Sequence, residues 1–217
     1  MSPESAQVGR RQKNMHDKQT RIFDAAAALF AEHGFESVTT QQVSDRAEIA
    51  AGTLFRYAAS KGELLLMIYN EDFRAALERG DRAAEAQTDP VQAVAALIEP
   101  ILAAAGRNIE NTVAYQRELL FGSPTDRYRS EGLWLVARLE ARIAELLTVS
   151  AASHGLDSPL LEEHSRLAGR SAFAVLHLAL ARPVTGAHPG HDAFTDLRAQ
   201  IAQIIAGFFT SLERREV

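Results

Sequence analysis

Apolar residues recur at intervals of three and four positions along most of this 217-residue chain, and this spacing constrains the fold more than any other feature. β-branched residues rarely alternate with polar ones, and alanine is abundant. The sequence therefore predicts an all-α protein of about nine helices. The pattern is clearest near the C-terminus, where it comprises Phe194, Leu197, Ile201, Ile204, Ile205, Phe208 and Leu212.

Turn and capping signals give the limits of the helices. Gly34 is a strong C-terminal stop, and Thr39 with Gln42 has capping-box spacing behind the apolar Val38. Ser60 is placed to cap a fourth helix. Beside that fourth helix, the expected helices cover residues 17–33, 40–47, 51–57, 90–104, 108–120, 128–152, 160–181 and 194–213.

Composition excludes several classes of protein. The chain has no cysteine, which rules out disulfides, thiolate metal sites and a cysteine nucleophile. No apolar run approaches the roughly 20 residues of a membrane span, and the N-terminus lacks the apolar stretch of a signal peptide. We therefore expect a cytoplasmic protein.

Charge is distributed unevenly along the chain. Residues 1–62 hold eight Lys and Arg against seven Asp and Glu, whereas the remainder holds fifteen against twenty-one. Arg10, Arg11, Lys13 and Lys18 cluster ahead of the first core helix. Residues 1–16 are expected to form a disordered basic arm, which is either a solvated tail or a segment that reaches a phosphate backbone.

The stretch GTLFRYAASKGEL, residues 52–64, predicts a helix too short to build much core, with polar ends on Thr53, Arg56 and Tyr57. Two short helices joined by a tight turn are typical of a helix-turn-helix, whose second helix lies in the DNA major groove. DNA would cover the outer face of residues 51–57. The hydroxyls of Thr53 and Tyr57 would then bind phosphate oxygens, and Arg56 would bind phosphate or guanine. Lys61, at the start of the next helix, is placed to bind a phosphate.

The segment LFAEHGFESVTTQQVSDRAEIAAGTLFRYAASKGELL resembles the DNA-binding signature of the tetracycline-repressor (TetR) family of transcription regulators. The resemblance covers roughly residues 20–66 and implies a nine-helix, Ω-shaped homodimer. It implies a helix-turn-helix domain over residues 17–62 and a ligand-binding, dimerising domain over residues 63–217. The residues that match DNA contacts of the family are Thr39, Gln41, Gly52, Thr53, Phe55, Arg56, Tyr57 and Lys61.

Four positions depart from the family pattern. Phe55 stands where tyrosine is usual, and Ala58 replaces an aromatic core residue. Glu48 occupies the usual glycine of the turn, which costs ~1–2 kcal/mol if the left-handed conformation is kept. Ala50 stands where serine caps the recognition helix, a loss of ~1 kcal/mol. These departures predict a less tightly pre-organised DNA reader.

The remaining candidates concern a ligand and a partner subunit. In this fold the pocket lies among the middle helices, so its candidate residues are Tyr115, Arg117, Phe121, Trp134 and His177, and their character suits a largely apolar small molecule. Small residues at three-to-four spacing predict a four-helix dimer bundle formed by the last two helices. The candidate interface residues are Ala168, Ala172, Leu176, Ala179, Leu180, Ile201, Ile205 and Phe208.

The function expected from these features is a ligand-responsive DNA-binding regulator, with repression as the expected direction. A second hypothesis is a helical ligand-binding or protein-interaction module in which Glu48, Ala50 and Ala58 have weakened or abolished DNA binding. No paired carboxylates, nucleophile elbow or glycine-rich phosphate loop points to an enzyme, and no cofactor is implied. His188 and His191 have a spacing that a metal can use, but no acidic cluster accompanies them.

Overall fold

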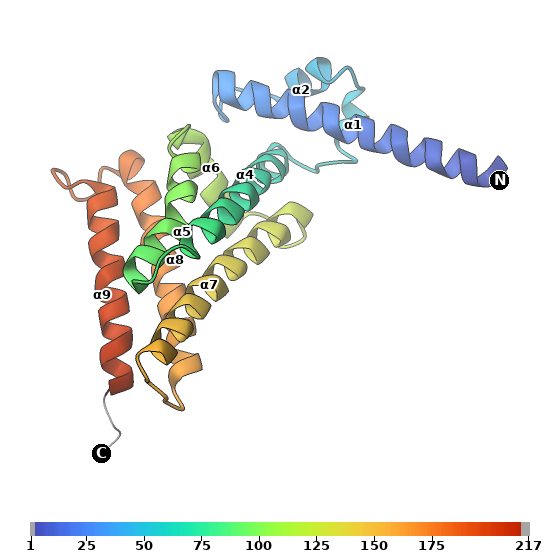
Figure 1. The fold of residues 1–217 in the computed structure, drawn as a ribbon. Coiled ribbons are helices and arrows are strands. Elements are labelled where there is room, and N and C mark those ends of the chain that lie inside the picture. The colour runs from blue at the N-terminus through green and yellow to red at the C-terminus, as the bar shows by residue number, and fades with distance from the viewer. Residues whose placement is uncertain (1–2, 214–217) are drawn as a thin grey trace.

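The computed structural model describes residues 3–213, with the side chains of residues 15–213. Within these residues the chain forms nine helices and no strand, which confirms the expected all-α fold (Figure 1). The helices are α1 (Pro3–His33), α2 (Thr40–Arg46), α3 (Ala51–Leu54), α4 (Lys61–Ala84), α5 (Pro90–Ala105), α6 (Ile109–Phe121), α7 (Arg127–Ser153), α8 (Leu161–Thr185) and α9 (Ala193–Glu213).

Local signals in the sequence account for several helix ends. Gly34 ends α1 with a positive φ of 76° and donates its amide to the Phe30 carbonyl at 3.1 Å. The Ser60 hydroxyl accepts a hydrogen bond from the Glu63 amide at 3.0 Å and so caps α4. Pro90 is the first residue of α5, where its missing N–H costs no hydrogen bond.

Helix α1 differs from the expectation at its N-terminal end. Residues 3–16 are helical and continuous with the rest of α1, instead of forming a disordered arm. Pro3 occupies the first helical position, and the residues that follow are mostly good helix formers. They carry no apolar stripe, so periodicity gave no sign of a helix there. In Figure 1 these first turns extend beyond the other helices.

A first core joins the N-terminal helices to the rest of the chain. Helices α1, α2 and α3 bury Ile22, Phe30, Val43 and Leu54 against the start of α4. The same cluster also contains side chains of α6 and α7, namely Ala114, Tyr115, Leu119, Tyr128 and Val136. The three-helix unit is therefore packed onto the larger helical part through shared buried side chains.

A second core lies among α4, α5, α7, α8 and α9. Helix α4 contributes to both cores, with residues 64–68 in the first and Ala76, Leu77 and Ala84 in the second. At Gly80 a Cβ atom would collide with the backbone carbonyl of Leu97, so glycine lets α4 and α5 approach closely. Helix α4 thus runs as one element from the N-terminal unit into the larger bundle (Figure 1).

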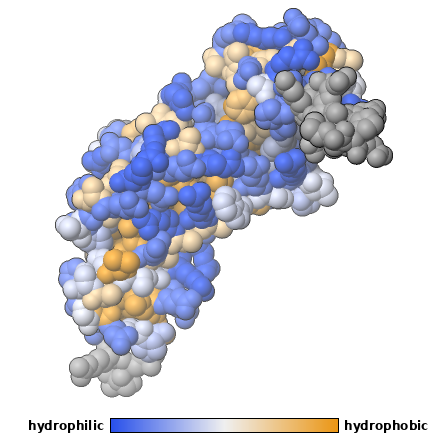
Figure 2. All heavy atoms as spheres, turned by 45° about the vertical axis from the view of Figure 1, so that its right-hand side comes forward, coloured by the Kyte–Doolittle hydropathy of each residue, from blue (hydrophilic) through white to orange (hydrophobic). Residues whose placement is uncertain are grey.

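The surface is largely hydrophilic. Figure 2 shows one face of the molecule, on which apolar side chains gather in patches over the larger helical part. None of the described helices combines the length and apolar character that a membrane crossing requires.

Candidate DNA-binding surface and pocket

Helix α2 is held at its start by the capping box expected from the sequence. The Thr39 hydroxyl accepts a hydrogen bond from the Gln42 amide at 3.2 Å, and the Gln42 side chain accepts one from the Thr39 amide at 2.8 Å. Val43 faces inward and is fully buried. Gln41 is exposed, and its side chain donates to the Asp45 carboxylate at 2.7 Å. Thr39 and Gln41 therefore both lie on the outer side of α2.

The turn between α2 and α3 keeps a conformation that favours glycine, although Glu48 occupies it. The φ angle of Glu48 is 52°. Its carboxylate is exposed and lies 3.8 Å from the Arg21 guanidinium on α1. Ala50 precedes α3 and supplies no side-chain hydrogen bond to the helix start. Glu48 thus keeps the left-handed conformation and α3 lacks a side-chain cap, as the sequence predicts.

Replacing Glu48 by glycine should raise the free energy of unfolding by about 0.5–1 kcal/mol. Relief of ~1–2 kcal/mol of left-handed strain outweighs the larger entropy loss of glycine on folding. Urea denaturation measures the change. The matched control is Ser37→Gly at an exposed turn residue, which has no positive φ and should gain no stability. A Glu48→Gly protein no more stable than the wild type would contradict strain at this turn.

Helix α3 presents its polar and aromatic side chains outward from a buried anchor. Leu54 is fully buried and Ala58 is 3% exposed, so these two residues fix the segment against the first core. Gly52 and Arg56 are exposed, and Phe55 is 49% exposed despite its apolar ring. The regular helix ends at Leu54, and residues 55–57 continue it as a turn instead of extending it to Tyr57.

Thr53 and Tyr57 are less accessible than their neighbours. Thr53 is half-buried, and the Tyr57 ring packs against the first core. The Tyr57 hydroxyl donates to the Met15 carbonyl at 3.4 Å, which is long for a bond from a hydroxyl. This weak bond leaves the hydroxyl able to exchange its partner for a phosphate oxygen.

Lys61 is engaged inside the protein, in contrast to the free clamp expected from the sequence. Its ammonium donates to the carbonyls of Phe35 and Glu36 at 2.8 and 3.3 Å. The same ammonium lies 4.3 Å from the centroid of the Phe35 ring. An ammonium has three donors, so one N–H stays available for a phosphate. Lys61 therefore ties the start of α4 to the segment that follows α1.

A pocket opens among α4, α5, α6, α7 and α8, with about 620 Å³ of space free of protein atoms, part of it open to solvent. Its walls are mostly apolar, and helix α4 supplies one face of the pocket through residues spaced at one helical turn. The lining residues are Tyr69, Asp72, Phe73, Ala76, Ile101, Ala104, Ala105, Thr112, Tyr115, Gln116, Leu119, Val136, Phe173, Leu176, His177 and Leu180.

The structure places only two of the five expected ligand residues at this pocket. Tyr115 and His177 line it. Phe121 is 82% exposed at the end of α6, and Trp134 is 57% exposed on α7. Arg117 lies on the outer side of α6, 3.4 Å from the Glu36 carboxylate. The assignment of Arg117, Phe121 and Trp134 to the pocket is therefore corrected.

Most polar groups of the pocket wall are already satisfied within the protein. The Thr112 hydroxyl donates to the Ala105 carbonyl at 2.8 Å, and the Tyr115 hydroxyl donates to the Asn70 side chain at 2.9 Å. Burial raises the pKa of Tyr115, so this hydroxyl keeps its proton. These groups shape the wall and do not call for a charged ligand.

Gln116 and His177 form the polar pair of the pocket. The Gln116 side-chain amide donates to the His177 carbonyl at 2.9 Å and lies 3.2 Å from the His177 Nδ1 atom. Burial lowers the pKa of His177, so the ring is neutral at pH 7. Because its Nδ1 faces an N–H donor, the ring carries its proton on Nε2 and offers one N–H to a ligand.

Sequence reasoning missed the contribution of α4 to the pocket. Tyr69, Asp72, Phe73 and Ala76 share one face of α4, and their i, i+3, i+4 and i+7 spacing was a readable signal. The rings of Tyr69 and Tyr115 stack with centroids 5.6 Å apart. In the sequence this face of α4 resembles one that packs in the core. Only the packed helices show that the space opposite it is unfilled.

The eight expected dimer residues lie inside the subunit's own core. None is more than 9% exposed, and all belong to the second core cluster. Next to them, at Gly169 of α8, a Cβ atom would collide with the backbone carbonyl of Glu140 on α7. The small residues of α8 therefore permit close packing within one chain. Six of the expected residues therefore pack within the core of one subunit, whereas Ala168 and Phe208 also line a groove between α8 and α9. The six are Ala172, Leu176, Ala179, Leu180, Ile201 and Ile205.

Among the side chains that the structure describes, those of residues 15–213, no group of three or more His, Asp or Glu is placed to hold a metal ion. Arg182, which is buried, donates to the carbonyls of His188 and His191 at 3.3 and 3.2 Å. The loop that carries the two histidines is thus folded onto the end of α8.

Comparison with known proteins places this geometry in context. Residues 22–68 match the model of the bacterial regulatory proteins of the tetR family. The chain is 34% identical over 105 residues to the HTH-type transcriptional repressor KstR of Mycobacterium tuberculosis, an alignment that covers 48% of each chain. The chain thus spans about half the length of the curated relatives that it matches.

Two solved structures share the fold over most of both chains. FadR of Thermus thermophilus, in complex with lauroyl-CoA, has a TM-score of 0.66 at 24% identity and covers 92% of this chain and 97% of its own. FadR of Bacillus subtilis, in complex with stearoyl-CoA, has a TM-score of 0.64 at 18% identity and covers 87% and 98%. At these identities the likeness concerns the fold.

Proposed function

We propose that the chain is a ligand-responsive transcriptional repressor of the tetR family of bacterial regulatory proteins, whose model residues 22–68 match. It binds a palindromic DNA operator as a homodimer and leaves the operator when a small molecule enters the pocket. The observation that carries this proposal is the exposure of Phe55 and Arg56 on a short segment anchored by Leu54 and Ala58. A segment with so little core of its own has its outer face available to the major groove.

Each exposed residue of the helix-turn-helix has a role in this proposal. Arg56 contacts guanine or phosphate, and the Phe55 ring suits the methyl group of thymine. Gly52 allows close approach, since no other atom lies within 4 Å of where its Cβ would stand. Thr53 and Thr39 contact phosphate oxygens. Lys61 primarily fixes α4 to the segment after α1 and reaches a phosphate with its remaining N–H.

The experiment that tests the function is selection of binding sites from a random DNA library, followed by fluorescence anisotropy at several salt concentrations. A repressor of this kind should select an inverted repeat and bind it at least a thousandfold more tightly than scrambled DNA. Affinity should fall steeply with salt, because phosphate contacts release counterions. Equal affinity for selected and scrambled DNA would contradict specific recognition.

The second hypothesis is a helical ligand-binding module that has lost DNA binding. Glu48 supports it, because its exposed carboxylate stands in the turn beside the proposed DNA surface. The same selection experiment separates the two hypotheses. If the wild type selects no site and Glu48→Gly does, loss of binding through this turn is the better account.

We infer that the part of the effector that enters the pocket is largely apolar and carries a single hydrogen-bonding group. The pocket wall is mostly apolar, and Gln116 and His177 offer a neutral polar pair. The pocket residue Asp72 pairs at 3.2 Å with Arg107, whose side chain is mostly exposed, so an anionic head group beside this pair would remain in solvent. Two structures with this fold hold acyl-CoA molecules, so lauroyl-CoA is the first compound to test.

The proposed dimer uses the outer faces of α8 and α9. A shallow groove between them is lined by Leu167, Ser171, Ile204 and Gly207, among others. Leu178 lies two turns after Ser171 on the same face of α8, and it is 54% exposed. Open space lies beyond Gly207, so a second backbone can approach there. Two copies that bring these faces together form the four-helix bundle expected from the sequence, with the exposed Leu167 and Leu178 at the contact beside Ala168 and Phe208.

A Leu178→Glu variant should be monomeric at micromolar concentration. In a two-fold dimer the new carboxylate of each subunit would be buried at the contact, and each burial costs on the order of several kcal/mol. Sedimentation velocity measures the mass. Val149→Glu is the control, because Val149 is also exposed and apolar but lies on α7. A dimeric Leu178→Glu protein would show that the contact lies elsewhere.

A further inference from the structure

Asn111 is a fully buried polar residue in the first turn of α6. Its Oδ1 atom accepts a hydrogen bond from the Phe35 amide at 2.7 Å, and its Nδ2 atom donates to the Phe30 carbonyl at 2.8 Å. Both backbone groups belong to the N-terminal unit, 76 and 81 residues earlier in the chain. One side chain of the larger bundle therefore closes the C-terminal end of α1.

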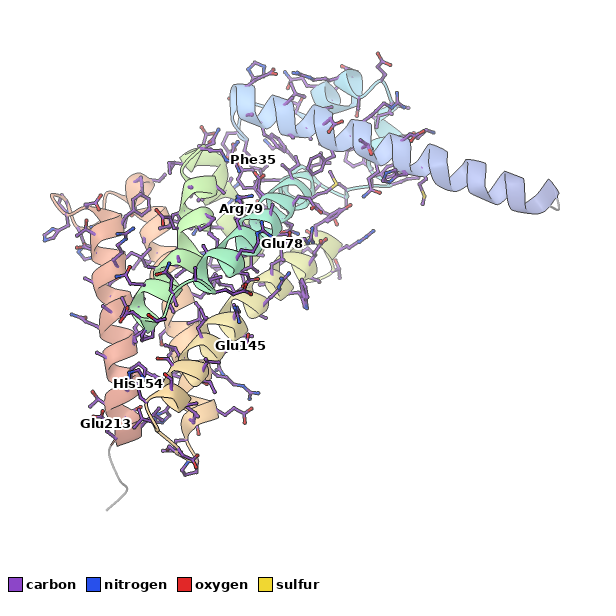
Figure 3. The ribbon with its side chains drawn as sticks, viewed as in Figure 1. Phe35, Glu78, Arg79, Glu145, His154 and Glu213 are labelled. Atoms are coloured by element: carbon purple, nitrogen blue, oxygen red, sulfur yellow. The ribbon has the colours of Figure 1, made fainter. Side chains whose placement is uncertain are left out.

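The segment held in this way leads directly into the helix-turn-helix. Gly34 turns the chain away from α1, and Thr39 caps the start of α2 five residues later. Phe35 lies where the upper end of α6 meets the N-terminal unit (Figure 3). Lys61 holds the same segment from the α4 side through the carbonyls of Phe35 and Glu36. The segment that leads into α2 is thus held by Lys61 from α4 and by Asn111 from α6.

The same helix that carries Asn111 forms a wall of the pocket. The next residue, Thr112, lines the pocket and donates to the Ala105 carbonyl at the end of α5. Tyr115, Gln116 and Leu119 continue the wall along α6. A molecule that displaces this wall moves Asn111 with it, because Asn111 and Thr112 are adjacent in one helical turn.

We propose that Asn111 is the positioning residue through which pocket occupancy changes the orientation of the helix-turn-helix, an inference that rests on the proposed function. Its planar amide holds a donor and an acceptor of one short backbone segment, so both bonds break or move together. The Arg117–Glu36 pair also joins α6 to this segment, but it is exposed and its atoms are 3.4 Å apart. An exposed pair of that kind transmits little, because water replaces it readily.

The first test compares Asn111→Leu with Arg117→Ala, after thermal denaturation has shown that both are folded. Leucine keeps the volume of the side chain and removes both hydrogen bonds. Three quantities are measured by anisotropy and by titration calorimetry: operator affinity, lauroyl-CoA affinity, and the factor by which lauroyl-CoA weakens operator binding. Asn111→Leu should lower that factor at least fivefold while changing lauroyl-CoA affinity less than threefold. Arg117→Ala should keep the wild-type factor.

A second test needs neither operator nor effector, so it decides the proposal even if the wild type binds no DNA. Ala105→Trp fills the pocket from the α5 side, and amide hydrogen exchange then reports on residues 36–47. The substitution should change exchange rates there severalfold in the wild-type background and leave them unchanged in the Asn111→Leu background. Equal responses in the two backgrounds, or no response in either, would overturn the role of Asn111.

Discussion

Replacing Arg56 by alanine should abolish sequence-specific DNA binding while leaving the fold and the dimer intact. The side chain is exposed and makes no hydrogen bond or ion pair among the described residues, so its removal costs little stability. A good arginine contact to a base contributes ~1–3 kcal/mol, and a dimer makes it twice. The expected loss is therefore at least about thirtyfold and extends to roughly ten-thousandfold. Anisotropy with the selected operator measures it.

Arg79→Ala is the matched control for this experiment. It removes the same charge from an exposed position on α4, within the larger helical part (Figure 3). Arg79→Ala should therefore leave operator affinity almost unchanged at physiological salt, where charges farther apart than about 8 Å are screened. If the two variants lose affinity equally, general electrostatics and not recognition by α3 explains the binding.

Filling the pocket with Ala105→Trp should strongly weaken effector binding, because Ala105 lines the pocket. The indole excludes part of the ligand from the pocket, and leaving ~100 Å² of apolar surface of ligand and wall together unburied costs ~2.5 kcal/mol. The affinity for lauroyl-CoA should fall about a hundredfold. Ala103→Trp is the control, because Ala103 is exposed on the same helix and does not line the pocket. Equal ligand affinity in both variants would show that the effector binds elsewhere.

The sequence predicted the helix-turn-helix well because its signals are local. The Thr39 capping box, the Gly34 stop and the Ser60 cap each depend on a few neighbouring residues, and all three appear in the structure. The left-handed Glu48 and the uncapped Ala50 were also expected, since the turn conformation follows from the family pattern. Where neighbouring residues set the backbone geometry within one turn, the residue types are sufficient to predict it.

The candidate pocket could not be predicted as well, because α7 is apolar on more than one side. Leu135 and Leu139 are fully buried, whereas the neighbouring Trp134 is exposed. Nothing in the spacing distinguishes the side that faces α4 from the side that faces solvent. The contacts of Lys61 with Phe35 and Glu36 could not be predicted either, because they join residues 25 or more positions apart.

The dimer residues show a further limit of sequence patterns. Small residues on α8 correctly indicated a close helix contact, but a sequence does not show which helix makes that contact. The structure shows that the partner is α7 of the same chain at Gly169. Leu167 and Leu178 look like core residues in the sequence, but they are exposed on the outer face of α8.

The measurement that tests the central claim most directly is a titration of lauroyl-CoA into the free protein and into the protein saturated with its operator. Linkage requires that the operator weaken effector binding by the factor with which the effector weakens operator binding. For a repressor with a coupling free energy of ~1–3 kcal/mol, that factor lies between about 5 and 150. We predict a dissociation constant that is higher by this factor in the presence of operator. Tight binding of lauroyl-CoA with the same dissociation constant in both titrations would contradict the claim that the pocket controls DNA binding.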